Sequence, residues 1–257
     1  MYETLSEDYD RFVNWDERLA YEMPFIEARI GILTGGTSRV LDILDSACGT
    51  GMHAIALAHI GHRVSGADLY PQMIKKSRAN ADHAGVQVNF ETTGLGAMTG
   101  VFGKEKFDLV LCLGNSLPHM LSAAELAAAL KDFTACLRPG GMVIIQNRNF
   151  DAVMRGQDRW MEPQVRRAGD TEWIFQRFYD YEENGWIRFN IVTLKREGNS
   201  SWVSSVASTR LRPQLRADLE TALADAGFAG IHAYGSMTGD KFSASSSGNL
   251  VLTAIKQ

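Results

Sequence analysis

The most constraining feature of the sequence is an apolar run that leads into a turn of small residues and then into a helix. The apolar run covers residues 40–44, the turn covers 45–50, and helical spacing continues from Gly51. Small residues in such a turn let a ligand approach the backbone, and the amides that begin a helix favour electronegative groups. This unit predicts an open α/β sheet with a ligand site at the carboxyl ends of its strands. The alternative is a turn that serves only tight packing of the helix against the sheet.

The pattern up to residue 150 continues to alternate short apolar runs with helical periodicity. Its clearest helix covers residues 122–137, where Ser122 and Glu125 form a capping box. Such alternation implies right-handed crossovers and a parallel sheet with helices on both faces. We therefore predict an α/β fold with a Rossmann-like, doubly wound, mostly parallel seven-stranded sheet. Its expected strands are 40–44, 63–67, 86–92, 107–113, 142–146, 231–235 and 249–255.

Residues 171–211 depart from this rhythm and predict an inserted antiparallel β-meander. Three β-prone stretches are separated by turn signals at 183–185 and 198–200, and a helix is expected over 213–226. The chain lacks a long linker or an internal repeat, so we expect a single domain with four regions. These are an N-terminal helical lid (1–38), a nucleotide-binding core (39–150), an antiparallel β insertion over the substrate pocket (151–211), and a C-terminal helix and strands that complete the core sheet (212–257).

The charge balance argues against two classes of partner. The chain has 26 Lys and Arg against 30 Asp and Glu, a net charge of −4, so it lacks the basic surface that nucleic acids and anionic membranes attract. The first residues are acidic, and no uninterrupted apolar stretch reaches transmembrane length. Three cysteines without a CxxC spacing argue against a disulfide framework and structural zinc. We therefore expect a cytoplasmic protein with no metal and no nucleic-acid or membrane partner.

Two carboxylates near the turn bear on which nucleotide it would bind. Asp68 follows the second strand, where it can accept from both hydroxyls of a ribose. Residues 49–54 match GxGxxA, and Asp68 follows at about the spacing of NAD-binding proteins. A dinucleotide fingerprint, however, starts directly after its strand, whereas residues 45–48 intervene here. Because the Asp45 carboxylate would repel a pyrophosphate and suit a cationic sulfonium, the sequence favours S-adenosylmethionine (SAM).

These residues belong to a longer series of motifs in the first half of the chain. In order, the series is Asp45 to Gly51, Asp68, Phe107 to Val110, and Leu137 to Gly141. The series resembles the ordered motifs of class I SAM-dependent methyltransferases, over about residues 1–151. Within that superfamily, segments 112–119 and 147–151 resemble glycine N-methyltransferase and its small-molecule relatives.

The resemblance implies a set of cofactor-binding residues. The backbone of Ala47 and Gly49 would face the methionine part of SAM, and an N-terminal lid that includes Trp15 would close over the site. The acidic residue that many relatives carry after the third strand is missing, so backbone and apolar contacts would hold the adenine. Arg18 would pair with the cofactor carboxylate; a surface ion pair with Glu22 is its alternative, and core packing is the alternative for the apolar members. The expected set is Tyr9, Arg18, Ala47, Gly49, Asp68, Leu69, Met73, Gly94, Leu95 and Leu113.

Polar residues after the fourth and fifth strands are the candidates for holding a methyl acceptor. Asn115, Ser116 and His119 follow the fourth strand, and orientation of the acceptor is the catalytic role expected for Asn115 and His119; a structural histidine is the alternative for the latter. Arg148 lies where glycine-methylating relatives use an arginine for the substrate carboxylate; an ion pair with Asp151 or with an acid of the meander is its alternative. The expected acceptor-binding residues are Asn115, Ser116, His119, Arg148 and Tyr179.

The resemblance implies a SAM-dependent methyltransferase that releases S-adenosylhomocysteine (SAH). Its expected acceptor is a small molecule, with the amine of glycine, sarcosine or a related amino-carboxylate first. An O- or C-methyltransferase of a small metabolite and a non-catalytic SAM-binding protein are the alternatives, with a dehydrogenase further behind. The sequence leaves open the acceptor, the number of methyl groups, the use of a general base and whether the chain forms a homo-oligomer.

Overall fold

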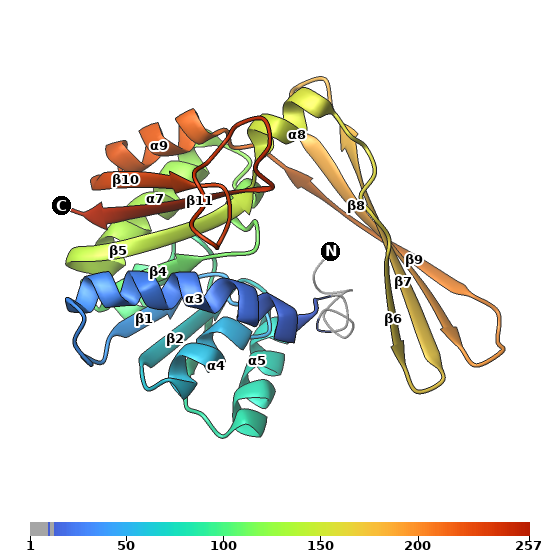
Figure 1. Ribbon diagram of the computed structural model, residues 1–257, viewed down its shortest axis with the longest axis horizontal. Coiled ribbons are helices and arrows are strands. Elements are labelled where there is room, and N and C mark those ends of the chain that lie inside the picture. Colours follow the sequence, from blue (N-terminus) through green and yellow to red (C-terminus); the bar gives the residue numbers. More distant parts are fainter. Residues whose placement is uncertain (1–9, 11–12) are drawn as a thin grey trace.

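The computed structural model describes residue 10 and residues 13–257, and it contains two β-sheets (Figure 1). The larger sheet is formed by β1 (Asp42–Asp45), β2 (Arg63–Asp68), β3 (Asn89–Thr92), β4 (Phe107–Cys112), β5 (Leu137–Arg148), β10 (Phe228–Tyr234) and β11 (Asn249–Lys256). Its strand order is β10-β11-β5-β4-β1-β2-β3. The pairs among β1 to β5 are parallel, whereas β11 pairs antiparallel with both β5 and β10. The predicted seven-stranded, mostly parallel sheet is confirmed.

Helices cover both faces of this sheet because alternate side chains of the buried strands point to opposite faces. Leu44 and Val110 pack in one apolar cluster, and Ile43 and Leu109 pack in the other. The first face is covered by α6 (Met98–Phe102), α7 (Ala123–Cys136) and α9 (Arg216–Asp225). The second face is covered by α3 (Trp15–Thr34), α4 (Met52–His59) and α5 (Pro71–Ala84). Among the described residues, no helix is both long and apolar enough to span a membrane.

The start of β5 differs from the prediction. Residues 139–141 were expected to form a turn before a strand at 142–146, but α7 ends at Cys136 and β5 begins at Leu137. A Cβ atom on Gly141 would lie only 2.9 Å from the carbonyl oxygen of Arg138 and 3.1 Å from that of Asp108. The ladder pairs Phe107 with Leu137 and Leu109 with Met142, so residues 138–141 bulge out of it where the turn was expected, and Gly141 fits the close approach of the backbone there.

Three short elements were not predicted: α6, the 3₁₀ helix η1 (Leu117–His119) and α8 (Phe150–Gly156). The start of α6 depends on a distant cap, because Asp132 in α7 accepts from the backbone amides of Met98 at 2.6 Å and Thr99 at 3.0 Å. Sequence patterns indicate helix caps only between residues that are close in sequence. Because Asp132 lies 34 residues from Met98, this cap leaves no local signal.

The second sheet is the predicted antiparallel insertion, with one more strand than expected. It contains β6 (Gln164–Ala168), β7 (Thr171–Tyr181), β8 (Ile187–Glu197) and β9 (Val203–Leu211), in that order. The extra strand, β6, contains Arg166 and Arg167, which gave it no apolar alternation. Figure 1 shows this sheet standing beside the core and joined to it near α8. At the junction Phe150 packs against Tyr179, Ile187 and Leu211.

Candidate cofactor and acceptor site

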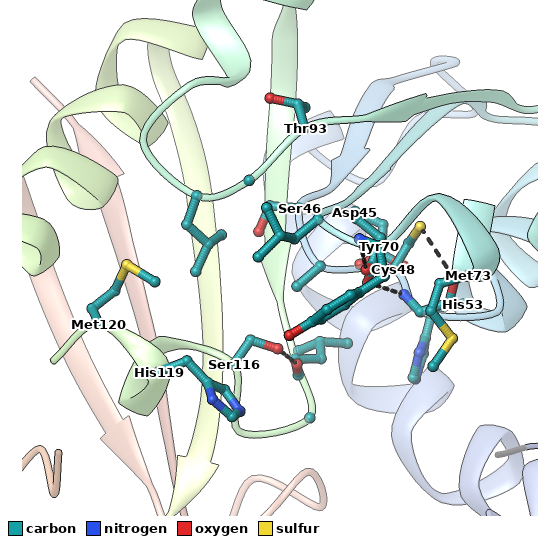
Figure 2. Close-up of a pocket in the computed structure, with 18 of the residues that line it drawn as sticks. Asp45, Ser46, Cys48, His53, Tyr70, Met73, Thr93, Ser116, His119 and Met120 are labelled. Atoms are coloured by element: carbon teal, nitrogen blue, oxygen red, sulfur yellow. Dashed lines mark hydrogen bonds between the residues drawn. The ribbon is translucent and has the colours of Figure 1, made fainter. Parts of the chain in front are cut away.

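A cavity of about 340 Å³ lies at the carboxyl ends of β1, β2 and β4, the position where open α/β sheets bind ligands. Eleven of the residues expected at the site line it: Arg18, Ala47, Gly49, Asp68, Leu69, Met73, Gly94, Leu95, Leu113, Ser116 and His119. Figure 2 shows His119, Ser116 and Met120 on one side of the cavity, and His53 and Met73 on the opposite side. Tyr9 lies outside the described residues.

The two glycines of the turn, Gly49 and Gly51, have different structural roles. Gly49 lines the cavity and donates its backbone N–H to Asp68 Oδ2 at 2.9 Å. Gly51 has a φ of +83°, and a Cβ atom there would lie 2.7 Å from Phe90 Cζ and 2.8 Å from Ser77 Cβ. The packing interpretation therefore holds at Gly51, which permits close contact with α5 and β3, while Gly49 faces the cavity and remains the candidate for ligand contact.

Asp68 ties the end of β2 to the turn after β1. Its Oδ2 accepts from Gly49, and its Oδ1 accepts from the backbone amide of Tyr70 at 2.9 Å. Burial raises the pKa of this carboxyl. An ionised carboxylate offers about four acceptor positions, so about two remain toward the cavity, which suits the paired hydroxyls of a ribose.

A second carboxylate, Asp45, lies at the base of the cavity at 2% exposure. Its Oδ2 atom is buried without a hydrogen-bond partner. Burial and, to a lesser extent, the charge of Asp68 raise the pKa of Asp45, the charges of His53 and Arg18 lower it, and the net result is a pKa of about 6. A buried acceptor without a partner is costly, and a cationic ammonium group from a ligand would satisfy it. The carboxylate acceptors at this end of the cavity thus fit the ammonium group of SAM and do not fit a pyrophosphate.

Arg18 forms the ion pair with Glu22 that was weighed as its alternative, and it also lies at the cavity. Its Nε lies 3.1 Å from Glu22 Oε2 within α3, and its side chain also lines the cavity. The same Glu22 oxygen lies 2.6 Å from His53 Nε2 in α4, and both of these side chains are buried. Burial would raise the pKa of Glu22, but the hydrogen bond to His53 and the charge of Arg18 lower it. Trp15 packs edge-on against the His53 ring and under the Arg18 guanidinium. This contact between α3 and α4 fixes Arg18 at the cavity.

One side of the cavity is formed by the segment around η1 and by β9. Ser116 and His119 line it together with Met120, and Thr209 and Arg210 reach it from the second sheet. Burial lowers the pKa of His119 to about 4. Its imidazole is therefore neutral at pH 7, when one ring nitrogen can accept a hydrogen bond. Thr209 and Arg210 had no signal in the sequence, because only the return of the chain through β9 brings them here.

The chain that leaves β9 holds η1 in place. Gln214 Nε2 donates to the Leu117 carbonyl at 2.8 Å, and the backbone amide of Arg212 donates to the Pro118 carbonyl at 2.8 Å. Asn147 Nδ2 in turn donates to Gln214 Oε1 at 3.4 Å, and both side chains are buried. The turn that carries His119 is therefore fixed by the same segment that carries the second sheet back to the core.

Three expected acceptor residues do not line the cavity. Asn115, with a φ of +68°, accepts at Oδ1 from the backbone amide of Arg148 at 3.0 Å. The Arg148 side chain hydrogen-bonds with Tyr179, whose pKa is raised by burial. Asp151 accepts from the backbone amide of Arg216, and within the described part of the chain it forms no ion pair with Arg148. These residues form a polar cluster beside the cavity, at the junction with the second sheet.

Comparison with known proteins bears on the family. Residues 43–141 match the family model described as "Methyltransferase domain". These residues contain the turn, Asp45, Asp68 and η1. Over residues 10 and 13–257, no group of three or more His, Cys, Asp or Glu side chains is arranged to hold a metal ion.

Similar proteins cover different parts of the chain. The glycine/sarcosine N-methyltransferase of Parasynechococcus marenigrum is 30% identical over 154 residues, which is 60% of this chain and 52% of that protein. The chain therefore spans about half the length of the curated relatives it matches. A SAM-dependent methyltransferase from Clostridium acetobutylicum shares the fold over 99% of this chain and 98% of its own, with a TM-score of 0.78 and 16% identity. A SAM-bound amino pentose methyltransferase from Micromonospora echinaspora covers 92% of both chains, with a TM-score of 0.70 and 20% identity.

Proposed function

We propose that the protein is a SAM-dependent methyltransferase whose acceptor is the amine of glycine, sarcosine or a related amino-carboxylate. The observation that carries the proposal is the buried, unpartnered Oδ2 of Asp45 at a cavity that Asp68 and Arg18 also line. One buried anion, one ribose-binding carboxylate and one guanidinium match the three polar parts of SAM. The family match over residues 43–141 supports the same cofactor.

Each polar group of the cofactor has a counterpart in this chain. Asp45 would accept from the ammonium, Arg18 would donate to the carboxylate, and Asp68 would accept from the ribose hydroxyls. Leu69 and Met73 would contact the adenine, whose edge would meet backbone groups near Gly94. When bound, SAM supplies an electrophilic methyl group, so the protein needs to supply orientation and a dry site rather than a nucleophile.

The acceptor amine would lie near His119 and Ser116. A neutral His119 can accept an N–H hydrogen bond and leave the amine lone pair directed at the methyl group. Burial next to a sulfonium cation favours the neutral form of the amine, and for this reason no dedicated general base is assigned. Arg148 would hold the acceptor carboxylate, with its backbone fixed by Asn115 and its guanidinium by Tyr179.

An amino sugar is the second candidate acceptor. It is favoured by the position of Arg148 outside the cavity lining and by the hydroxyl-bearing Ser116 and Thr209 within it. The solved amino pentose methyltransferase resembles this chain through the second sheet as well as the core. The glycine-methylating relatives, in contrast, match about 60% of the chain.

The experiment is SAH production measured by mass spectrometry with glycine, sarcosine and amino sugars as separate acceptors. We expect glycine or sarcosine to give turnover, and Arg148→Ala to raise KM for that acceptor at least tenfold while SAH affinity stays unchanged. Arg155→Ala, an exposed arginine in nearby α8, is the matched control. Turnover with amino sugars alone selects the second candidate. SAH binding without turnover by any acceptor would leave the non-catalytic alternative.

A further inference from the structure

The residue before α5 is a tyrosine at a position that favours short polar side chains. Tyr70 is the N-cap of α5, Pro71 follows it in the first turn, and the Tyr70 side chain does not cap the helix. Serine, threonine, aspartate and asparagine are preferred at an N-cap because their side chains accept from backbone amides of the first turn. An aromatic residue here weakens the start of α5, so the reason for it lies outside the helix.

The backbone of Tyr70 is fixed on both sides. Its N–H donates to Asp68 Oδ1 at 2.9 Å, and its carbonyl accepts from the amides of Met73 at 3.0 Å and Ile74 at 3.2 Å. The proline that follows restricts residue 70 to extended backbone, in agreement with its φ of −99° and ψ of 117°. The loop that places Asp68 at the cavity therefore also sets the direction of the Tyr70 side chain.

The Tyr70 side chain lines the cofactor cavity and is half-buried. Figure 2 shows its ring extending across the cavity from the end of β2, with the hydroxyl directed to the side of Ser116 and His119. The ring therefore lies between Asp68, the carboxylate suited to a ribose, and the residues near η1.

The covalent structure of SAM places its sulfonium in this part of the cavity. The sulfur joins the ribose to the amino-acid part, so a cofactor bound by Asp68 at the ribose and by Arg18 and Asp45 at the amino acid has its sulfur between them. We propose that the Tyr70 ring contacts this sulfonium and thereby raises the affinity for SAM relative to SAH. This inference rests on the proposed function, because it requires SAM as the ligand.

The chemistry of the two ligands makes such a contact distinguishable from ordinary packing. The face of an aromatic ring attracts a cation within about 6 Å of its centre. SAM and SAH share the adenine, the ribose, the ammonium and the carboxylate, and they differ in the methyl group and the charge on sulfur. A ring that contacts a shared part affects both affinities equally, whereas a ring at the sulfonium affects the affinity for SAM alone.

The ratio of SAM affinity to SAH affinity, measured by titration calorimetry, tests the contact. We expect Tyr70→Leu to lower this ratio roughly three- to thirtyfold, and Tyr70→Phe to keep it because the ring remains. Both variants retain Asp45 and Asp68, whose charges also attract the sulfonium. Tyr21→Leu, at an exposed tyrosine of α3, is the matched control and should keep the wild-type ratio.

Three results would count against the inference. An unchanged ratio in Tyr70→Leu overturns it, even if both affinities fall, because the ring then contacts a part that SAM and SAH share. An equal fall of the ratio in Tyr70→Phe overturns it by assigning the effect to the hydroxyl. A wild-type protein that binds neither ligand rejects the proposed function itself, a result distinct from an unchanged ratio.

Tyr70→Ser separates the role in the cavity from the role in the helix. Serine can cap α5, so we expect the Tm of the free protein to rise by roughly 2–4 °C, together with a lower ratio of SAM affinity to SAH affinity. A lower Tm with the wild-type ratio would show that Tyr70 supports the fold and does not contact the sulfonium.

Discussion

Gly49 and Asp68 are joined by a backbone-to-carboxylate hydrogen bond of 2.9 Å, which fixes the turn after β1 to the end of β2. Asp68 therefore supports the shape of the cavity and also lines it. We expect Asp68→Ala to lower SAH affinity at least tenfold and to destabilise the fold by about 1.5–3 kcal/mol, the usual worth of hydrogen bonds to a charged group. Calorimetric titration and thermal unfolding check the two effects. An unchanged SAH affinity would remove Asp68 from the cofactor site.

The pH dependence of cofactor binding follows from Asp45. Burial raises its pKa from 3.8 to about 6, so the free protein holds a proton there between these values and the unfolded chain does not. Stability of the free protein from this group therefore falls as pH rises from about 4 to about 6. Affinity for the ammonium-bearing SAH rises over the upper part of this range, because binding selects the ionised carboxylate.

Asp45→Asn separates these two effects. The variant keeps the shape of the side chain without the buried charge, and we expect a higher Tm for the free protein at pH 7.5 together with weaker SAH binding. Titration calorimetry between pH 5 and 8 should show a smaller change of affinity with pH than in the wild type. A variant that keeps the full pH dependence would assign it to another group.

Glycine substitutions distinguish packing from backbone freedom. Gly51→Ala would place a Cβ atom within 3 Å of Phe90 and Ser77 at a positive φ. Overpacking and the left-handed conformation together predict a loss of about 2–4 kcal/mol. Gly100→Ala, where nothing lies within 4 Å of the added atom, is the control and is expected to be neutral or slightly stabilising. Urea unfolding measures both, and equal stabilities would contradict the close contact.

Gln214 is predicted to act on catalysis through η1. Gln214→Leu removes the hydrogen bond to the Leu117 carbonyl and leaves that buried acceptor without its donor. The expected loss of folding stability is about 1–3 kcal/mol, and kcat/KM for the acceptor is expected to fall because the turn that carries His119 loses one of its anchors. SAH affinity should change less than twofold. Gln87→Leu, an exposed glutamine before β3, is the matched control; an equal loss in both variants would exclude a specific role.

The cofactor half of the site was predictable from sequence because its determinants are local. Gly49 lies in the turn after β1 and Asp68 ends β2, and parallel strands place their carboxyl ends on one edge of the sheet. In contrast, Trp15 of α3 packs against His53 of α4, and His53 pairs with the buried Glu22 of α3. No rule of sequence spacing connects these three residues. The residues on the side of the cavity near η1 are brought together only by the topology of the chain.

Arg148 and Thr209 illustrate that limit. Arg148 follows a core strand and was expected at the pocket, yet its side chain meets Tyr179 beside the cavity. Thr209 lies in a β-prone stretch without any chemical signature, yet it lines the cavity because β9 turns back toward η1. Alternation of apolar and polar residues predicts a strand but not where that strand lies relative to the rest of the fold. The residues that β9 contributes to the cavity could therefore not be predicted.

The hydrogen bonds from Arg212 and Gln214 to η1 set a rule for chimaeras of this fold. A graft that exchanged only residues 151–211 would bring in the second sheet of another protein, but the hydrogen bonds to η1 would still come from the recipient's residues 212 and 214. The acceptor selectivity of the grafted protein should therefore transfer only when the graft extends to residue 214, so that the second sheet and the residues that bind η1 are exchanged together.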